Sequence, residues 1–247
     1  MLAGQHAEPI LEVCVDGPVG AAIAAQSGAD RIELCSALSL GGITPSLGAV
    51  RLALRQDIPV HVLIRPRSGG FHYNDAESET MLEDISDIVA AGASGLVLGA
   101  LDSKNDLDLP LLDRLLRTSG DIPVTLHRAF DFARNSSDAL EQAIELGFSR
   151  ILTSGEQPDV IRGLENLQSL FERAGDRISI MPGGGVTPEN LPRLLAALPL
   201  TEIHASCKRR AHSGTNSEFA LGPTDDGGYF ETCAETVRAM RDLLGRQ

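Results

Sequence analysis

Short runs of apolar, β-branched residues alternate with longer amphipathic stretches along the chain, and this alternation limits the possible folds more than any other feature. The strand-like runs fall near residues 11–15, 31–35, 59–65, 95–100, 123–128, 150–154, 178–182 and 201–207. Between them lie helical patterns such as those over residues 76–91 and 137–146. About eight strand–helix units in a chain of this length predict an α/β fold, a (β/α)8 TIM barrel. A doubly wound sheet usually uses fewer units and often opens with a G-x-G-x-x-G turn, which is absent after the first strand.

The length and the charge set the domain count and the classes of partner. The 247 residues, of which 43% are hydrophobic, can bury a full core, so we expect one domain over residues 1–247 with an N-terminal tail at 1–9. The formal net charge of -13 would repel phosphate backbones and anionic lipids, and no lysine or arginine cluster offsets it. We therefore expect neither a nucleic-acid partner nor a membrane partner.

The N-terminus and the cysteines indicate the compartment. Residues 1–9 contain neither the basic region nor the apolar run of a signal peptide, and no later apolar stretch reaches transmembrane length. The cysteines at positions 14, 35, 207 and 233 form no C-x-x-C pair, and a chain of this size does not need disulfides. We expect a cytoplasmic protein with free thiols, and the sequence is compatible with a homo-oligomer.

Polar residues interrupt the apolar strands at alternate positions. Since side chains alternate along a strand, the polar residues share the face that lines the barrel, and the apolar residues between them pack on the helices. Aliphatic residues would fill a purely structural barrel, so this pattern predicts a site at the mouth formed by the carboxyl ends of the strands. The alternative is a set of buried ion pairs without a function, such as Glu33 with Arg65. The polar residues are Glu12, Glu33, His61, Arg65, Thr125, His127, Ser179, His204 and Ser206.

Two cysteines occupy matched places in the first two predicted strands, each two residues after a glutamate. Glu12 and Cys14 share one face of their strand, as Glu33 and Cys35 do, so neighbouring strands would bring two thiols and two carboxyls together. Cu(I) is soft and favours thiolates, so two cysteines about 5 Å apart on adjacent strands suit a Cu(I) site. The glutamates are hard oxygen ligands that do not suit Cu(I), and buried free cysteines are often packing residues only.

Glycine-rich turns follow the second and seventh predicted strands. In Gly41-Gly42-Ile43-Thr44-Pro45 and Gly184-Gly185-Val186-Thr187-Pro188, threonine is placed to cap a helix and proline to begin it. Backbone N–H groups at such a turn can face an anion, and Arg65 and Arg67 after the third strand add positive charge. The turns predict anion binding, although glycine with threonine and proline is also ordinary at the start of a helix.

A set of motifs resembles the CutC copper-homeostasis family. The matching segments are residues 12–16, 28–35, 41–46, 64–67, 125–131, 152–155 and 181–185, in order and at barrel spacing. The resemblance implies a cytosolic TIM barrel that handles copper, with Cys14 and Cys35 as Cu(I) ligands, and it adds no established reaction. The sequence departs from the family pattern over residues 208–227, where a methionine and an Arg-Asn pair would be expected and Ser213-Gly214-Thr215-Asn216-Ser217 stands instead.

The competing hypothesis is an enzyme, a lyase or isomerase that acts on a small phosphorylated or carboxylated metabolite. Glu12 or Glu33 would be the general base and His127 the acid. No lysine lies in a predicted strand core, so a Schiff-base mechanism is disfavoured, and no nucleotide cofactor is implied. The partner is thus a copper ion or a small anionic metabolite. The residues expected to bind that anion are Arg65, Arg67, Arg128, Asp131, Ser154, Gly183, Gly184, Gly185 and His204.

Overall fold

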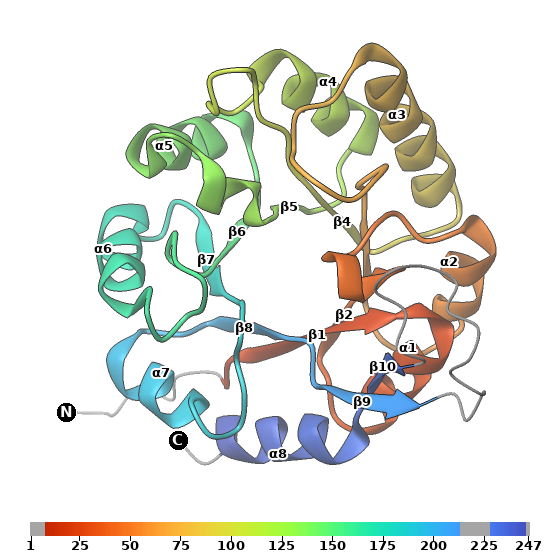
Figure 1. The fold of residues 1–247 in the computed structure, drawn as a ribbon, viewed down its shortest axis with the longest axis vertical. Helices are drawn as coiled ribbons and strands as arrows, with labels where there is room; N and C mark the ends of the chain where they lie inside the picture. Colours follow the sequence, from red (N-terminus) through yellow and green to blue (C-terminus); the bar gives the residue numbers. More distant parts are fainter. Residues whose placement is uncertain (1–7, 213–227, 246–247) are drawn as a thin grey trace.

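Eight parallel strands form a ring that helices surround, as Figure 1 shows for the computed structural model, which describes residues 8–212 and 228–245. The hydrogen-bonded order is β7-β6-β5-β4-β3-β2-β1-β8, and β7 and β8 lie against each other. The predicted (β/α)8 barrel is confirmed, and each predicted strand overlaps an observed one. Residues 1–7 of the expected N-terminal tail lie outside the described residues. The strands are β1 (Ile10–Asp16), β2 (Arg31–Cys35), β3 (Val60–Leu63), β4 (Gly95–Leu98), β5 (Val124–Leu126), β6 (Arg150–Thr153), β7 (Ser179–Pro182) and β8 (Glu202–Ala205).

Helices follow the strands and pack their apolar faces on the outside of the ring. In α3 the predicted helical pattern is confirmed, and a reciprocal cap fixes its start: Asn74 accepts the backbone N–H of Glu77, whose carboxylate accepts that of Asn74. The helices are α1 (Gly17–Gln26), α2 (Leu47–Ala53), α3 (Asp75–Ala90), α4 (Leu109–Ser119), α5 (Ser136–Leu146), α6 (Leu164–Ala174), α7 (Leu191–Ala197) and α8 (Ala234–Leu244), with short 3-10 helices η1 (Leu38–Leu40) and η2 (Arg128–Phe132).

Two helix starts were predicted wrongly. Helix α2 begins at Leu47 with Ser46 as its cap, because the Thr44 hydroxyl instead accepts the backbone N–H of Arg65 at 2.8 Å. Helix α7 begins at Leu191, because residues 187–190 form a separate turn in which Asn190 accepts the N–H of Thr187 at 2.9 Å. The glycine-rich turns therefore do not run directly into helix N-termini.

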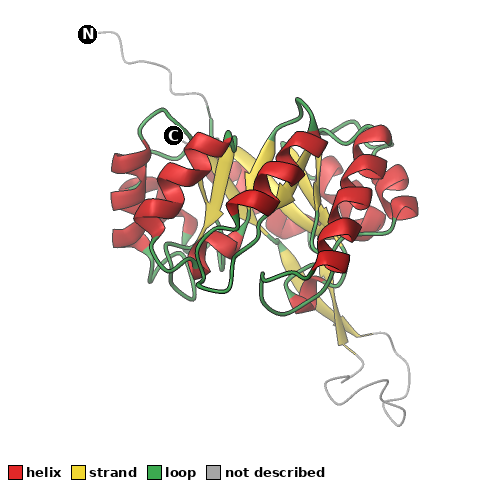
Figure 2. Cartoon of the chain, turned by 90° about the horizontal axis from the view of Figure 1, so that it is seen from above, coloured by secondary structure: helices red, strands yellow, loops and turns green. Residues whose placement is uncertain are grey.

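An antiparallel hairpin that the sequence pattern did not predict follows β8. It consists of β9 (Lys208–His212) and β10 (Gly228–Thr232), and it projects from one end of the barrel (Figure 2). The divergent segment 208–227 is thus β9 followed by residues 213–227, and the latter lie outside the described residues. Among the described helices, none is both long enough and apolar enough to cross a membrane.

The strand faces divide the apolar side chains into two clusters. The larger cluster lies between strands and helices and includes Val13 and Leu34. The smaller one lies inside the ring and comprises Cys14, Cys35, Leu63 and Val97, packed with Leu38. This division agrees with the predicted alternation, because Cys14 and Cys35 fall on the opposite strand face from their apolar neighbours.

Candidate functional site

Buried ion pairs occupy the barrel interior below the mouth. Arg31 donates to Glu12 at 2.5 Å and also to Glu202, whose carboxylate accepts from Arg150 Nε at 3.1 Å. The Ser179 hydroxyl donates to the same carboxylate at 2.8 Å. Burial of these charges is tolerated because each one has an opposite charge beside it. Three members of this group, Arg31, Arg150 and Glu202, were not predicted from the sequence, although Arg31 lies on the same strand face as Glu33.

A histidine between two glutamates forms the next layer toward the mouth. His204 Nδ1 lies 2.8 Å from Glu12 Oε1 and 3.4 Å from Glu33 Oε2. Burial alone would lower the pKa of His204, but the hydrogen bond to Glu12 and the charges of both glutamates raise it. Burial opposes ionisation of Glu12 too, yet the His204 hydrogen bond and the Arg31 charge hold its pKa well below the usual range.

Glu33 differs from Glu12 because, among residues 8–212 and 228–245, no arginine donates a hydrogen bond to it. Its burial, together with the Glu12 charge, raises the pKa of Glu33 to about 7, although the charge of His204 opposes this shift. The two glutamates on neighbouring strands therefore hold protons with different affinity. The pairing of Glu33 with Arg65, given as the alternative to a functional site, is absent from the ion pairs of the described residues, which in this layer join Glu33 to His204.

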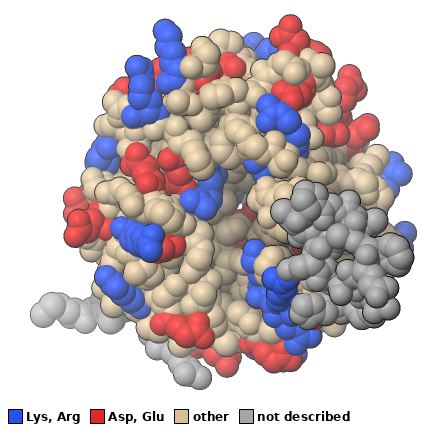
Figure 3. Space-filling view, in the orientation of Figure 1, with Lys and Arg blue, Asp and Glu red and all other residues tan. Residues whose placement is uncertain are grey.

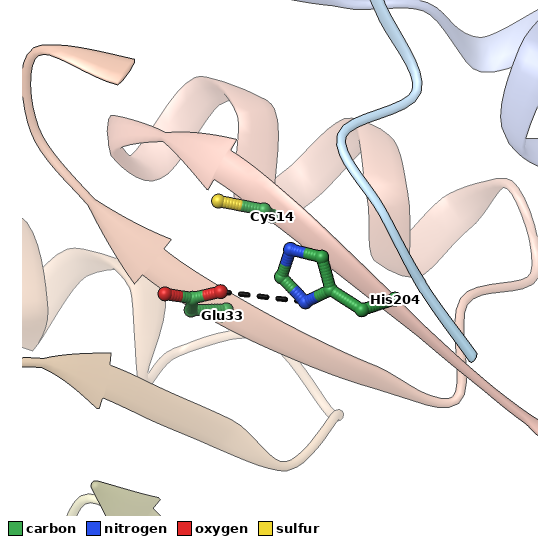
Figure 4. A group of neighbouring side chains, drawn as sticks. All are labelled: Cys14, Glu33 and His204. Atoms are coloured by element: carbon green, nitrogen blue, oxygen red, sulfur yellow. Dashed lines mark ion pairs between the residues drawn. The ribbon is translucent and has the colours of Figure 1, made fainter. Parts of the chain in front are cut away.

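The two strand cysteines meet as the sequence predicts. Cys14 Sγ and Cys35 Sγ lie 3.9 Å apart, and the Cys35 thiol donates to Val15 O at 3.4 Å. The contact with Cys35, followed by burial, raises the pKa of the Cys14 thiol well above its ordinary value. In the described part of the chain, Cys14, Glu33 and His204 form the group whose ligand atoms lie within 4.8 Å of one another, and Figure 4 shows their side chains converging. Cys207 is not part of this group.

His127 and Arg65 lie at the mouth beside this group. The backbone N–H of Ala129 donates to His127 Nδ1 at 3.1 Å, so the proton of the neutral ring is on Nε2. Burial, helped by the Arg65 charge, lowers the pKa of His127 to about 3. Arg65 donates from Nη1 to Gly42 O at 2.8 Å and from Nη2 to Gly69 O at 2.6 Å. At neutral pH, His127 is therefore suited to donate a hydrogen bond rather than to release a proton.

A cavity of about 220 Å³ opens at the mouth, where Figure 3 shows a hollow near the centre of the molecule. Six predicted site residues line it, whereas Glu12 and Cys35 are fully buried next to it. The remaining lining residues are mainly apolar. The lining comprises Cys14, Glu33, Leu38, Gly41, Leu63, Arg65, Phe71, His127, Arg128, Phe132, Leu152 and His204.

Three residues expected to bind an anion are instead bonded to one another. Asp131 accepts from Arg128 Nε at 2.7 Å and from the backbone N–H of Ser154 at 3.2 Å, and Arg128 Nη2 donates to the Ser154 hydroxyl at 2.7 Å. Arg67, also expected there, donates to Glu77 at 2.5 Å and is not among the residues that line the cavity. Of these four residues, only Arg128 lines the cavity. The roles of all four in anion binding stay predictions.

The turn Gly183–Gly185 has a packing requirement of its own. A Cβ at Gly183 would clash with Leu152 and would lie 3.0 Å from His204 Cβ, so glycine lets β8 and its histidine approach closely. Gly184 and Gly185 have φ of +109° and +76°, which side chains rarely adopt. The glycines thus have a structural explanation, and anion binding by this turn stays a prediction.

Known proteins are similar in sequence to this chain over nearly its whole length. The model described as the CutC family matches residues 9–209. A family protein CutC from Agrobacterium fabrum is 50% identical over 235 residues, covering 95% of this chain and 94% of that protein. The human copper homeostasis protein cutC homolog is 45% identical over 238 residues, covering 95% of this chain and 87% of that protein.

A solved structure agrees with these sequence matches. The crystal structure of a CutC protein from Streptococcus agalactiae superposes with a TM-score of 0.76 at 35% identity, covering 80% of this chain and 98% of that one. The family resemblance found in the motifs is confirmed, and the chain belongs to the CutC family.

Proposed function

We propose that this protein takes part in copper homeostasis by binding Cu(I) between Cys14 and Cys35. The observation that carries the proposal is the 3.9 Å separation of the two buried Sγ atoms. Thiolates are the ligands that Cu(I) prefers, and two metal–thiolate bonds of about 2.3 Å each, the length known for zinc, reach across this separation. Copper is the cargo here, and the thiols are the groups that hold it.

A copper ion that enters through the cavity at the barrel mouth would contact Cys14 first. Cys14 borders the cavity at the barrel mouth, whereas Cys35 is fully buried behind it. An ion arriving from the mouth therefore meets one sulfur before the other. His204 lies within ligand distance of Cys14, and its Nδ1 is engaged by Glu12, so Nε2 is the ring nitrogen available to a metal.

The donor set also defines the main competing metal. A cysteine, a glutamate and a histidine within 4.8 Å of one another suit Zn²⁺, which accepts sulfur, oxygen and nitrogen ligands. Glu33 is a hard oxygen ligand and suits Cu(I) poorly, so the proposal depends on the pair of thiols and not on the group of three. Substitution of Cys35 separates the two sites, because Cys35 belongs only to the thiol pair.

The experiment is an anaerobic Cu(I) titration of the reduced protein against a competing chelator. The variants are Cys14→Ser, Cys35→Ser and the double substitution, with Cys207→Ser/Cys233→Ser as the matched control. We expect one Cu(I) per chain, bound at least tenfold more weakly after either single substitution in the pair and unchanged in the control. Binding that is indifferent to Cys35→Ser would refute the two-thiol site, and Zn²⁺ binding that depends on Glu33 would then point to the three-residue group.

The proposal places the protein in the cytoplasm, where thiols stay reduced and able to bind copper. All four cysteines are free, including the buried pair. The names of the human and mouse relatives concern copper homeostasis rather than a lyase or isomerase reaction, so copper handling is preferred over the enzyme hypothesis. Fractionation of cells, followed by detection of the protein, tests the location.

A further inference from the structure

Two buried hydrogen-bond donors at the barrel mouth have no acceptor in the described part of the chain. They are Arg65 Nε and His127 Nε2. The hydroxyl of Tyr73, which lies beside the Arg65 side chain, is a further buried polar group without a well-aligned partner. Arg65 is 7% exposed and His127 is 5% exposed, and both residues line the same cavity. A buried donor without an acceptor costs about 1–3 kcal/mol, so native proteins seldom leave one in place without a ligand, a water or a functional reason.

Arg65 also lacks an opposite charge. Its Nη groups donate to the carbonyl oxygens of Leu40, Gly42 and Gly69, and no ion pair joins it to a carboxylate among the residues that the structure describes. The arginine deeper in the barrel, Arg31, is by contrast neutralised by two glutamates. The Tyr73 hydroxyl and the Phe71 ring also lie beside this guanidinium, but neither carries a negative charge, so an anion can still neutralise it.

The tautomer of His127 makes its free nitrogen a donor. Since Ala129 N–H occupies Nδ1, the ring is neutral and carries its hydrogen on Nε2. Both unpartnered atoms are therefore N–H donors, one charged and one neutral, and both lack an oxygen acceptor. Neither atom offers a lone pair to a metal ion, so these two donors suit an anion and take no part in the proposed Cu(I) site.

The walls of the cavity indicate the rest of the ligand. Apolar side chains make up much of the lining, namely Leu38, Leu63, Leu152, Phe71 and Phe132. The volume of about 220 Å³ is below the roughly 300–1,000 Å³ typical of pockets for drug-sized molecules, so the ligand is small. Inorganic phosphate has no apolar part that could pack against these side chains.

We propose that the barrel mouth binds a small organic carboxylate, with its carboxylate group on Arg65 Nε and His127 Nε2 and its apolar body against Phe71 and Phe132. This site uses other atoms than the Cys14 and Cys35 thiols, although Cys14 borders the same cavity, and it does not depend on copper binding. The Phe71 ring lies beside both residues: its centroid is 4.8 Å from that of the His127 ring and 5.2 Å from Arg65 Cζ. A ligand bound to the two donors would therefore be within reach of this ring.

The test compares benzoate with its neutral isostere benzamide on the full-length, metal-free, reduced protein by isothermal titration calorimetry. We expect benzoate to bind at least tenfold more tightly than benzamide. Arg65→Gln should weaken benzoate tenfold or more, and His127→Asn several-fold, because the asparagine amide keeps an acceptor for Ala129 N–H but removes the Nε2 donor. Arg117→Gln, at an exposed arginine of α4, is the charge-matched control and should not change binding.

Several outcomes would overturn the proposal. They are equal binding of benzoate and benzamide, unchanged benzoate binding in both variants, no benzoate binding at millimolar concentration, or binding of inorganic phosphate alone. Should Arg65→Gln fail to fold because its loop contacts are lost, the benzoate–benzamide comparison and His127→Asn still decide. Loss of Cu(I) binding in the cysteine variants leaves this result unaffected, so the two proposals fail separately.

The chain itself offers a second readout. It contains no tryptophan, and Phe132 is 61% exposed with its ring 5.6 Å from that of Phe71. Phe132→Trp therefore introduces a single tryptophan, which can be excited selectively, next to the Phe71 ring. Saturable quenching or a spectral shift with benzoate, absent with benzamide, is expected. A signal that does not change while calorimetry shows binding would place the carboxylate elsewhere.

Discussion

The buried arginine of β2 offers the sharpest test of how the barrel interior is held together. Arg31 is 7% exposed at its side chain, and it donates to Glu12 at 2.5 Å and to Glu202. Replacement by methionine keeps much of the side-chain volume but leaves two buried carboxylates without this cation. Breaking a buried pair in this way costs about 3–5 kcal/mol. Since Glu12 keeps His204 and Glu202 keeps Arg150, we expect the lower end, about 3 kcal/mol.

The assay is urea unfolding followed by far-UV circular dichroism, because the chain contains no tryptophan for fluorescence. A loss of about 3 kcal/mol corresponds to a fall in Tm of about 6–12 °C for a chain of this size. Arg114→Met is the control, because Arg114 and Glu79 form an exposed pair that should contribute at most about 1 kcal/mol. Adding Glu12→Gln to Arg31→Met should recover part of the loss. A cost for Arg31→Met no larger than the control would refute this account of the interior.

Three further predictions concern other parts of the barrel. Burial and the Arg65 charge lower the pKa of His127 from 6.5 to about 3. Between pH 6.5 and pH 3 this histidine therefore binds a proton in the unfolded chain but not in the folded one. Its contribution lowers the free energy of unfolding by about 1.4 kcal/mol for each pH unit of acidification. His127→Asn should remove that part of the pH dependence, and parallel unfolding slopes for both proteins would contradict this. Gly95→Ala puts a Cβ 2.6 Å from His61 Nε2, so the histidine ring must shift. We expect this to cost about 1–3 kcal/mol of stability, measured as a fall in Tm. A Tm equal to that of the wild type would show that the ring has room. Asp131→Asn weakens the bonds that hold Ser154, with an expected cost of about 1–3 kcal/mol in urea, and unchanged unfolding would disprove a structural role.

Most of the architecture could be predicted because the barrel leaves a strong periodic signal. The alternation of polar and apolar positions correctly placed Cys14, Glu33 and His204 on the inner face of three different strands, since a strand has only two faces. Their convergence then follows from the closure of the ring. The parity that identified Glu33 applies equally to Arg31, two residues earlier, which the search for mouth residues passed over.

The remaining details depend on contacts between distant segments. Thr44 is a plausible helix cap in sequence, but folding brings the Arg65 N–H to its hydroxyl and a different residue caps the helix. The charge of Arg65 suggests a carboxylate partner, yet the loops supply carbonyl oxygens instead. The tautomer of His127 is set by a backbone N–H two residues later. Which donors stay free is therefore a property of the folded loops, and residue types alone do not reveal it.

Two sulfur atoms are proposed to hold the copper ion, and X-ray absorption at the copper K-edge counts the sulfur neighbours of that ion. The sample is the reduced protein loaded anaerobically with one equivalent of Cu(I), measured beside Cys35→Ser. Because Cys14 Sγ and Cys35 Sγ lie 3.9 Å apart, the account predicts two sulfur neighbours in the wild type and one in the variant. A first shell dominated by nitrogen and oxygen, or one that Cys35→Ser leaves unchanged, would contradict the two-thiol site.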